Sequence, residues 1–345
     1  MAVCEKPTFL EQIVSLLPGP YVVKCIIFAS ILGVPLLLLT RFFDTLDIQA
    51  TLTIFNPLSW QSVVTFSFAN FILIFYAAYG VRYMRSKLYA MMPEIRSILP
   101  ENSKKIQEIF KPTCKLTSAA ILSLLLAAVS LASFPDQFSQ HSAGSISLIQ
   151  VALSFPFMYL TYGTFIWFYS SSVKCLHDLG KQPLKLADYY EDTYLGAKPI
   201  GSLSLSMALV YFSGLGLVFF SFLSIPAPLE FALIIMILGG IVLFFLPLNT
   251  IHKKMQQKKQ LERDKLKNLH KLQKESVYES MQNIQKIPTR DLKHMLQVDI
   301  VDRHVNSIPE WPFNLRTLTW LSAIVLAVIA SIIAKYVTIL LIMTG

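Results

Sequence analysis

One charged side chain lies deep within an apolar stretch near the end of the chain. Lys335 follows Ser331 and precedes Thr338 at one-turn helical spacing, so the three polar groups share one helix face. A charge inside a membrane helix is a functional candidate, although a lysine also packs against other helices or snorkels toward the membrane surface. Both interpretations stay open. A helix face of small and polar residues suits the wall of a narrow pore as well as close helix packing. The pore-lining candidates on this face are Ser331, Lys335, Thr338, Ala327 and Ala334.

Enzyme and metal motifs are missing from the sequence. It contains no HExxH, CxxC, phosphate-binding loop or nucleophile elbow, and its six histidines show no metal-ligand spacing. The acidic residues Asp188, Glu191 and Asp192 are more typical of a solvated or ion-paired loop than of a catalytic pair. We therefore expect no enzymatic activity, no catalytic residue, no metal site and no cofactor.

The helix face that carries Lys335 belongs to one of several long apolar runs in the sequence. Of the 345 residues 54% are hydrophobic and 15% charged, and runs of about twenty apolar residues match the hydrocarbon thickness of a bilayer. This pattern predicts an all-α, polytopic membrane protein with about seven transmembrane helices. The predicted spans are Tyr21–Thr40, Ser62–Tyr83, Leu116–Phe134, Ser147–Tyr169, Leu203–Leu223, Leu229–Asn249 and Leu318–Met343.

The distribution of basic residues predicts the orientation of these spans. Lysines and arginines collect after the second, fourth and sixth spans and are nearly missing from the other connections. By the positive-inside rule, the N-terminus is cytoplasmic and the C-terminus lies outside, in a multi-pass protein of the plasma membrane. The net charge of +9 then reflects contact with anionic lipid, so no nucleic-acid partner is expected.

The same pattern divides the chain into four regions. Residues 1–20 form a cytoplasmic, amphipathic N-terminal segment, and residues 21–250 hold the first six spans with cytoplasmic loops at 84–115 and 171–202. Residues 251–310 form a cytoplasmic helical anchor region, and residues 311–345 hold the seventh span.

The anchor region is predicted to contain two long helices. Residues 251–287 are rich in helix formers and lack Gly and Pro, so the sixth span is expected to continue as one helix, bent at Pro247 and ended by Pro288. Thr289 then caps a second helix, up to Ile308. Its apolar stripe suits packing between helices or subunits, and a solvated, weakly packed helix is the alternative. The anchor candidates are Leu292, Met295, Leu296, Val301 and Val305.

This arrangement resembles the seven-transmembrane ion channel superfamily that includes insect odorant and gustatory receptors. The resemblance is distant and architectural: inside-N topology, a cytoplasmic anchor layer, and a last helix split into Thr289–Ile308 and Leu318–Met343. It implies a homotetrameric ion channel with a central pore lined by the seventh helix. It also implies a small-molecule ligand site among spans two to six.

Two alternatives belong to other classes. The basic run Lys253–Lys274 equally suits a non-conducting membrane receptor or scaffold that binds a partner or anionic lipid. The spacing of Ser331 and Lys335 is also similar to the retinal-bearing segment of heliorhodopsins. The third span, Leu116–Phe134, has no carboxylate to balance a protonated Schiff base, which argues against a retinal protein.

Overall fold

A computed structural model of the chain contains helices and no strand within the residues that it describes. The described residues are 7–46, 60–99, 108–133, 145–187, 192, 194–221, 227–282, 289–309, 311–312 and scattered positions between 319 and 337. The elements are α1 (Phe9–Ser15), α2 (Tyr21–Leu46), α4 (Trp60–Ser97), the 3-10 turn η1 (Lys111–Cys114), α6 (Leu116–Ser133), α8 (Ser145–Lys181), α9 (Lys198–Ser221), α10 (Ala227–Gln282) and α11 (Thr289–Ser307).

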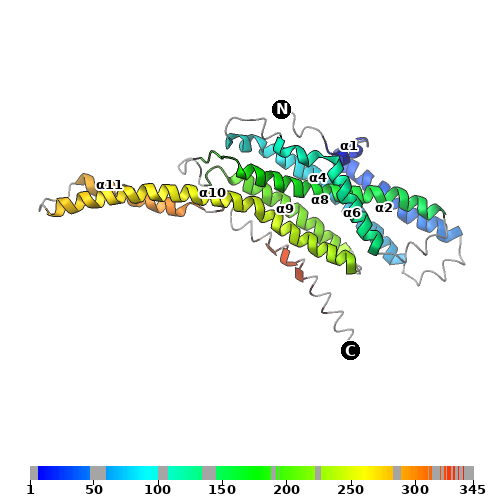
Figure 1. Ribbon diagram of the computed structural model, residues 1–345. Coiled ribbons are helices and arrows are strands. Elements are labelled where there is room, and N and C mark those ends of the chain that lie inside the picture. The colour runs from blue at the N-terminus through cyan, green and yellow to red at the C-terminus, as the bar shows by residue number, and fades with distance from the viewer. Residues whose placement is uncertain are drawn as a thin grey trace.

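Helix α9 lies beside α8 and α10 in a helical bundle (Figure 1). It packs against α4, α8 and α10, while α2 covers α4 and α6 covers α8. Along α9, the side chains of Leu203, Met207 and Tyr211 are buried at helical spacing in one continuous apolar core. The bundle therefore has a single hydrophobic core that several helices share.

Buried tyrosines lock four of these helices together. The rings of Tyr169 (α8) and Tyr211 (α9) stack with centroids 4.1 Å apart. Their hydroxyls donate to two carbonyls of α10, Tyr211 to Met236 at 3.0 Å and Tyr169 to Gly240 at 3.2 Å. Tyr76 of α4 donates to the carbonyl of Val210 on α9 at 2.9 Å. Each of these three hydroxyls donates to a backbone carbonyl of a neighbouring helix, so none of them is buried without a hydrogen-bond partner.

Three helices of the described chain have the length and hydropathy to cross a membrane. Their apolar stretches lie within Glu108–Val129, Lys198–Phe219 and Phe231–Asn268. They overlap the predicted third, fifth and sixth spans. A shorter apolar helix, Tyr21–Gly33, falls in the predicted first span, and most of the predicted seventh span lies outside the described residues.

The membrane half of α10 presents a continuous apolar stripe to its surroundings. The stripe recurs every three to four residues and consists of exposed large side chains: Phe231, Ile235, Leu238, Val242 and Phe245. A soluble protein rarely exposes a contiguous apolar surface of this kind, whereas lipid covers it at no cost. The outward face of α10 therefore fits a bilayer.

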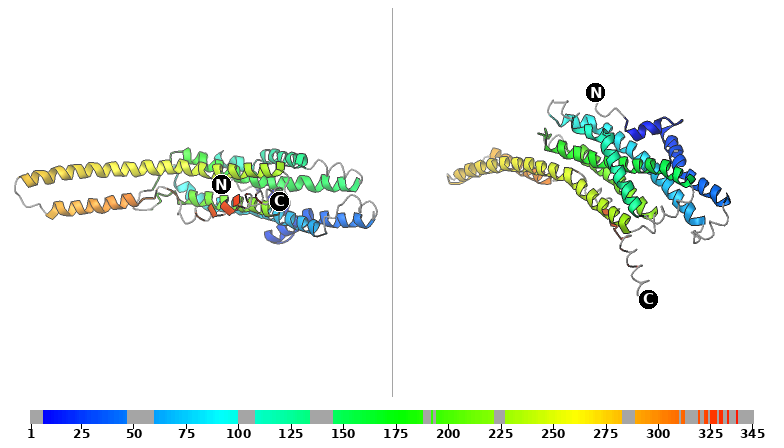
Figure 2. Two further views of the ribbon diagram at one scale, coloured as in Figure 1. Left: turned by 90° about the horizontal axis from the view of Figure 1, so that it is seen from below. Right: turned by 45° about the vertical axis from the view of Figure 1, so that its right-hand side comes forward.

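Helix α10 continues far beyond the bundle, and α11 folds back beside it (Figures 1 and 2). Its 56 residues correspond to a length of about 84 Å. The prediction of one continuous helix is confirmed, with Pro247 inside it and a gradual curve along its length in Figure 2, whereas its predicted end at Pro288 lies outside the described residues. The second anchor helix is also confirmed at Thr289–Ser307, one residue shorter than predicted. We call this pair the α10–α11 extension.

Two predicted cytoplasmic loops begin as helix. Within the predicted loops 84–115 and 171–202, α4 continues to Ser97 and α8 to Lys181. Both helices keep an apolar face on the core beyond the span, with Leu88 and Ile95 buried in α4 and Leu176 and Leu179 in α8. Hydropathy marks the segment that suits lipid, but an amphipathic face is enough to continue a helix on the core.

Candidate functional site

The residues after α11 form a joint between the α10–α11 extension and the last helical segment. Trp311 stacks on His252 of α10, with ring centroids 4.2 Å apart and an interplanar angle of 11°. On the other side, Pro312 contacts α9 at Gly201, where an added Cβ would lie 2.9 Å from the carbonyl carbon of Pro312. Since Gly201 has no side chain, the loop backbone reaches α9 directly. The joint is therefore held by α9 and α10 together.

Two basic side chains of α10 hold the C-terminal end of α11. Lys259 Nζ donates to the carbonyl of Ile308 at 2.9 Å and to that of Asn306 at 3.4 Å. Arg263 Nη2 donates to Asn306 Oδ1 at 2.7 Å. The last carbonyls of a helix have no intrahelical donor and carry partial negative charge, so cations stabilise this end. These contacts fix α11 to α10 just before the joint.

A third basic side chain of α10, that of Lys254, holds the end of α8 in the same way. Lys254 Nζ donates to the carbonyl of Gln182, immediately after the last residue of α8. Burial lowers the pKa of the Lys254 ammonium from its ordinary value. The start of the α10–α11 extension is thus tied by basic side chains to both α8 and α11.

The pore-lining candidates fall largely outside the described residues. Ser331, Lys335, Thr338 and Ala334 lie there, so their role stays a prediction. Ala327 is described and exposed, as are Ala323 and Ala330 on the same face.

At the described positions of the last segment, one side of the helix contacts the rest of the bundle. Val325 packs against the core, whereas Leu326, Ile333 and Val337 are exposed on the side that directly adjoins the alanines. A single chain therefore leaves both a small-residue face and a bulky apolar face of this segment uncovered.

The anchor candidates divide between two environments. Val305 is buried and Val301 is partly buried, both packed in the core that α10 shares. Leu296 is 58% exposed, and its neighbour Ile300, which the prediction did not include, is 49% exposed. The side chains of Leu292 and Met295 lie outside the described residues. Only Leu296 of the described candidates is thus free to contact another molecule.

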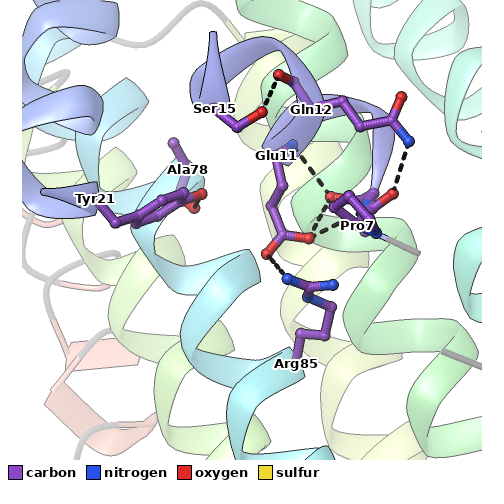
Figure 3. A network of polar contacts seen from close by, with 8 residues as sticks. Pro7, Glu11, Gln12, Ser15, Tyr21, Ala78 and Arg85 are labelled. Carbon is purple, nitrogen blue, oxygen red and sulfur yellow. Dashed lines mark hydrogen bonds and ion pairs between the residues drawn. The ribbon is translucent and has the colours of Figure 1, made fainter. Parts of the chain in front are cut away.

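A buried ion pair near the N-terminus was not anticipated from the sequence (Figure 3). Glu11 of α1 is almost fully buried, and its Oε1 lies 2.9 Å from Nη2 of Arg85 on α4. Its Oε2 accepts from the backbone N–H of Thr8 at 3.0 Å and from the Thr8 hydroxyl at 2.9 Å. The Thr8-x-x-Glu11 spacing is a capping-box signal that marks the start of α1, but it does not reveal Arg85 as a partner.

No family model, curated protein or solved structure matches this chain.

The function of the joint is therefore inferred from the chemistry of its own residues. Within the described part of the chain, no group of three or more His, Cys, Asp or Glu side chains could hold a metal ion. The polar contacts of the joint use cations, backbone carbonyls and stacked rings, which are interactions that hold helices together and bind anions. The arrangement attaches the C-terminal end of α11 and the residues that follow it to α9 and α10.

Proposed function

We propose that the protein is a homotetrameric ion channel of the plasma membrane, with seven spans, a cytoplasmic N-terminus and a pore lined by the last helix. The α10–α11 extension carries the argument for assembly. Leu261 of α10 and Leu296 and Ile300 of α11 are exposed apolar side chains. Leu261 lies twelve residues beyond the predicted end of the sixth span, about 18 Å along the helix, and is therefore outside the hydrocarbon layer.

Apolar side chains in that position need a protein partner, because lipid does not reach them and water does not favour them. A second copy of the chain supplies the same surface, and closed symmetric assembly is the commonest form of oligomer. Copies that join through the extension bring their last segments together near the symmetry axis. The uncovered small-residue face of that segment then borders the pore, and its bulky face contacts lipid.

The first test is the native mass of the purified protein in mild detergent. We expect a tetramer for the natural chain and for Leu296→Met, which keeps an apolar side chain of similar size. We expect dissociation for the double variant Leu296→Glu/Ile300→Glu, because charges at both positions would have to lose their hydration in the interface. A monomeric natural chain would rule out a shared pore and favour the non-conducting receptor or scaffold.

A second test locates the last segment within the assembly. Oxidation of Ala327→Cys is expected to cross-link copies, because a disulfide forms only when the two Cα atoms approach within about 7 Å. Ile333→Cys, on the bulky exposed face, serves as the matched control and should remain uncross-linked. Equal cross-linking of the two variants would contradict a defined face toward the axis. Ion flux through liposomes, with substitutions at Ser331, Lys335 and Thr338, then tests conduction itself.

A further inference from the structure

A polar groove lies on α10 where the helix leaves the predicted membrane. Its volume is about 400 Å³, within the range of small-ligand sites, and it is lined by Lys253, Gln256, Gln257, Lys259, Gln260 and Arg263. The lining consists of cationic and amide side chains. Such groups donate several hydrogen bonds to phosphate oxygens and to hydroxyl groups.

The positive charge of this groove is only partly neutralised. Lys253 is exposed, and neither Lys253 nor Arg263 forms an ion pair within the described part of the chain. Lys259, only 7% exposed, is held at the floor by the carbonyls at the end of α11. The carboxylate of Asp264 accepts from the amide of Gln260 at 3.2 Å. The groove therefore favours an anion.

The joint places one end of the groove at the membrane surface. Trp311 stacks on His252, and Lys253 is the next residue of α10. Tryptophan is enriched at the level of the lipid headgroups, and the cytoplasmic leaflet carries the anionic lipids. Lys253 then lies at the depth of the lipid phosphates. This step rests on the membrane orientation proposed above, but not on conduction.

The length of the groove indicates what kind of headgroup it fits. Lys253 and Arg263 are ten residues apart on α10, which corresponds to about 15 Å along the helix axis. A single phosphate at the bilayer surface does not reach both cations. A sugar-like polyol that carries further phosphate groups extends away from the surface, and its hydroxyls match the glutamine amides between the cations.

We propose that this groove binds the headgroup of an anionic lipid in which phosphate groups are attached to a polyol ring. The diester phosphate lies at Lys253, and the outer phosphates lie toward Arg263. Because Arg263 and Lys259 also hold the end of α11, the bound lipid contacts the residues that fix the joint before the last segment.

The test measures binding of dioctanoyl phosphatidylinositol 4,5-bisphosphate to the full-length protein in mild detergent by native mass spectrometry. The variant Lys253→Gln/Arg263→Gln is expected to bind about thirtyfold more weakly, and Lys253→Gln alone about fivefold, since each basic residue contributes about 1 kcal/mol to anionic lipid binding. The matched control Lys267→Gln/Lys271→Gln removes two exposed charges of the same helix outside the groove. It is expected to weaken binding less than threefold.

Three results would overturn the proposal. Equal losses in the two double variants would show diffuse attraction to the basic helix instead of a site. Equal affinity for dioctanoyl phosphatidylglycerol would exclude a need for the phosphorylated ring. Equal affinity for soluble inositol 1,4,5-trisphosphate would assign the groove to a free anion. Because none of these measurements requires ion flux, failure here is distinguishable from failure of the channel proposal.

Discussion

Replacing Gly163 with leucine is expected to destabilise the bundle by about 3 kcal/mol, the upper range for overpacking a tightly packed contact. Gly163 lies on α8 where α6 crosses it, and an added Cβ would lie 2.8 Å from both the Cα and the backbone nitrogen of Ser123. Those are backbone atoms of a helix and do not move aside as the end of a flexible side chain does. The two helices would have to separate.

The neighbourhood of Gly163 explains why separation is costly. On α6, Ala119 and Ser123 are small, buried and four residues apart, which is the spacing that lets membrane helices approach closely. Much of the rest of α6 is exposed, including Ile121 and Leu124. The contact with α8 is therefore its main attachment to the bundle.

The effect of Gly163→Leu is measured as a fall in the thermal unfolding midpoint in detergent. Gly239→Leu is the matched control, because no atom of the described residues lies within 4 Å of a Cβ built at Gly239. Leucine is also a better helix former than glycine, so the control should be at least as stable as the natural chain. Similar losses in the two variants would show that close packing at Gly163 is not the cause.

The helices of the α10–α11 extension could be predicted because their signals are local. The stretch from Ile251 to Gln282 contains helix formers without Gly or Pro, and the helix runs through all of it. Thr289 and Pro309 bracket the second helix, which ends at Ser307. Secondary structure of this kind is determined by neighbouring residues, so the sequence alone was sufficient.

The contacts that organise the joint could not be predicted because they connect distant parts of the chain. The residue type of Trp311 suits a membrane surface, but nothing near it in the sequence indicates its partner His252, which lies 59 positions earlier. The sequence around Gly201 likewise carries no signal for the contact with Pro312 that the structure brings against it. Whether a glycine permits flexibility or close approach depends on what the fold places beside it.

The candidate residues show the same division. Helical periodicity placed Leu296 and Val305 on one apolar stripe, but the structure buries Val305 against the core and exposes Leu296. Nine residues correspond to about 180° around a helix, so Leu296 and Val305 point to opposite sides, and the predicted stripe consists of two faces rather than one. The pore-lining role of Ser331, Lys335, Thr338 and Ala334 depends on the assembly and stays a prediction.

Arg85→Met is expected to destabilise the protein by about 3 kcal/mol, because it leaves the buried carboxylate of Glu11 without its cation. The ion pair is well shielded, with the Arg85 side chain 15% and the Glu11 side chain 2% exposed. Within the described part of the chain, Glu11 Oε1 accepts no other hydrogen bond, so Arg85 Nη2 is its polar contact. Loss of the arginine should release α1 from α4 and make the N-terminal residues accessible to protease.

A double-mutant cycle separates the ion pair from packing and capping. Glu11→Met/Arg85→Met is expected to lose less unfolding free energy than the two single variants lose together, since no charge then remains buried without a partner. Some loss should persist, because Glu11 also accepts from the N–H and hydroxyl of Thr8 at the start of α1.

The control for this cycle is Lys181→Met, which breaks the exposed pair of Lys181 with Asp178 at 3.8 Å. Solvent screens that pair, so the change in stability should be small. Thermal midpoints and limited proteolysis of the N-terminus are compared for all four variants. If Arg85→Met were as stable and as protease-resistant as Lys181→Met, the buried pair would not be what holds α1. The apolar contacts of Leu10 and Val14, which are buried on the same helix, would then be sufficient to anchor the N-terminus.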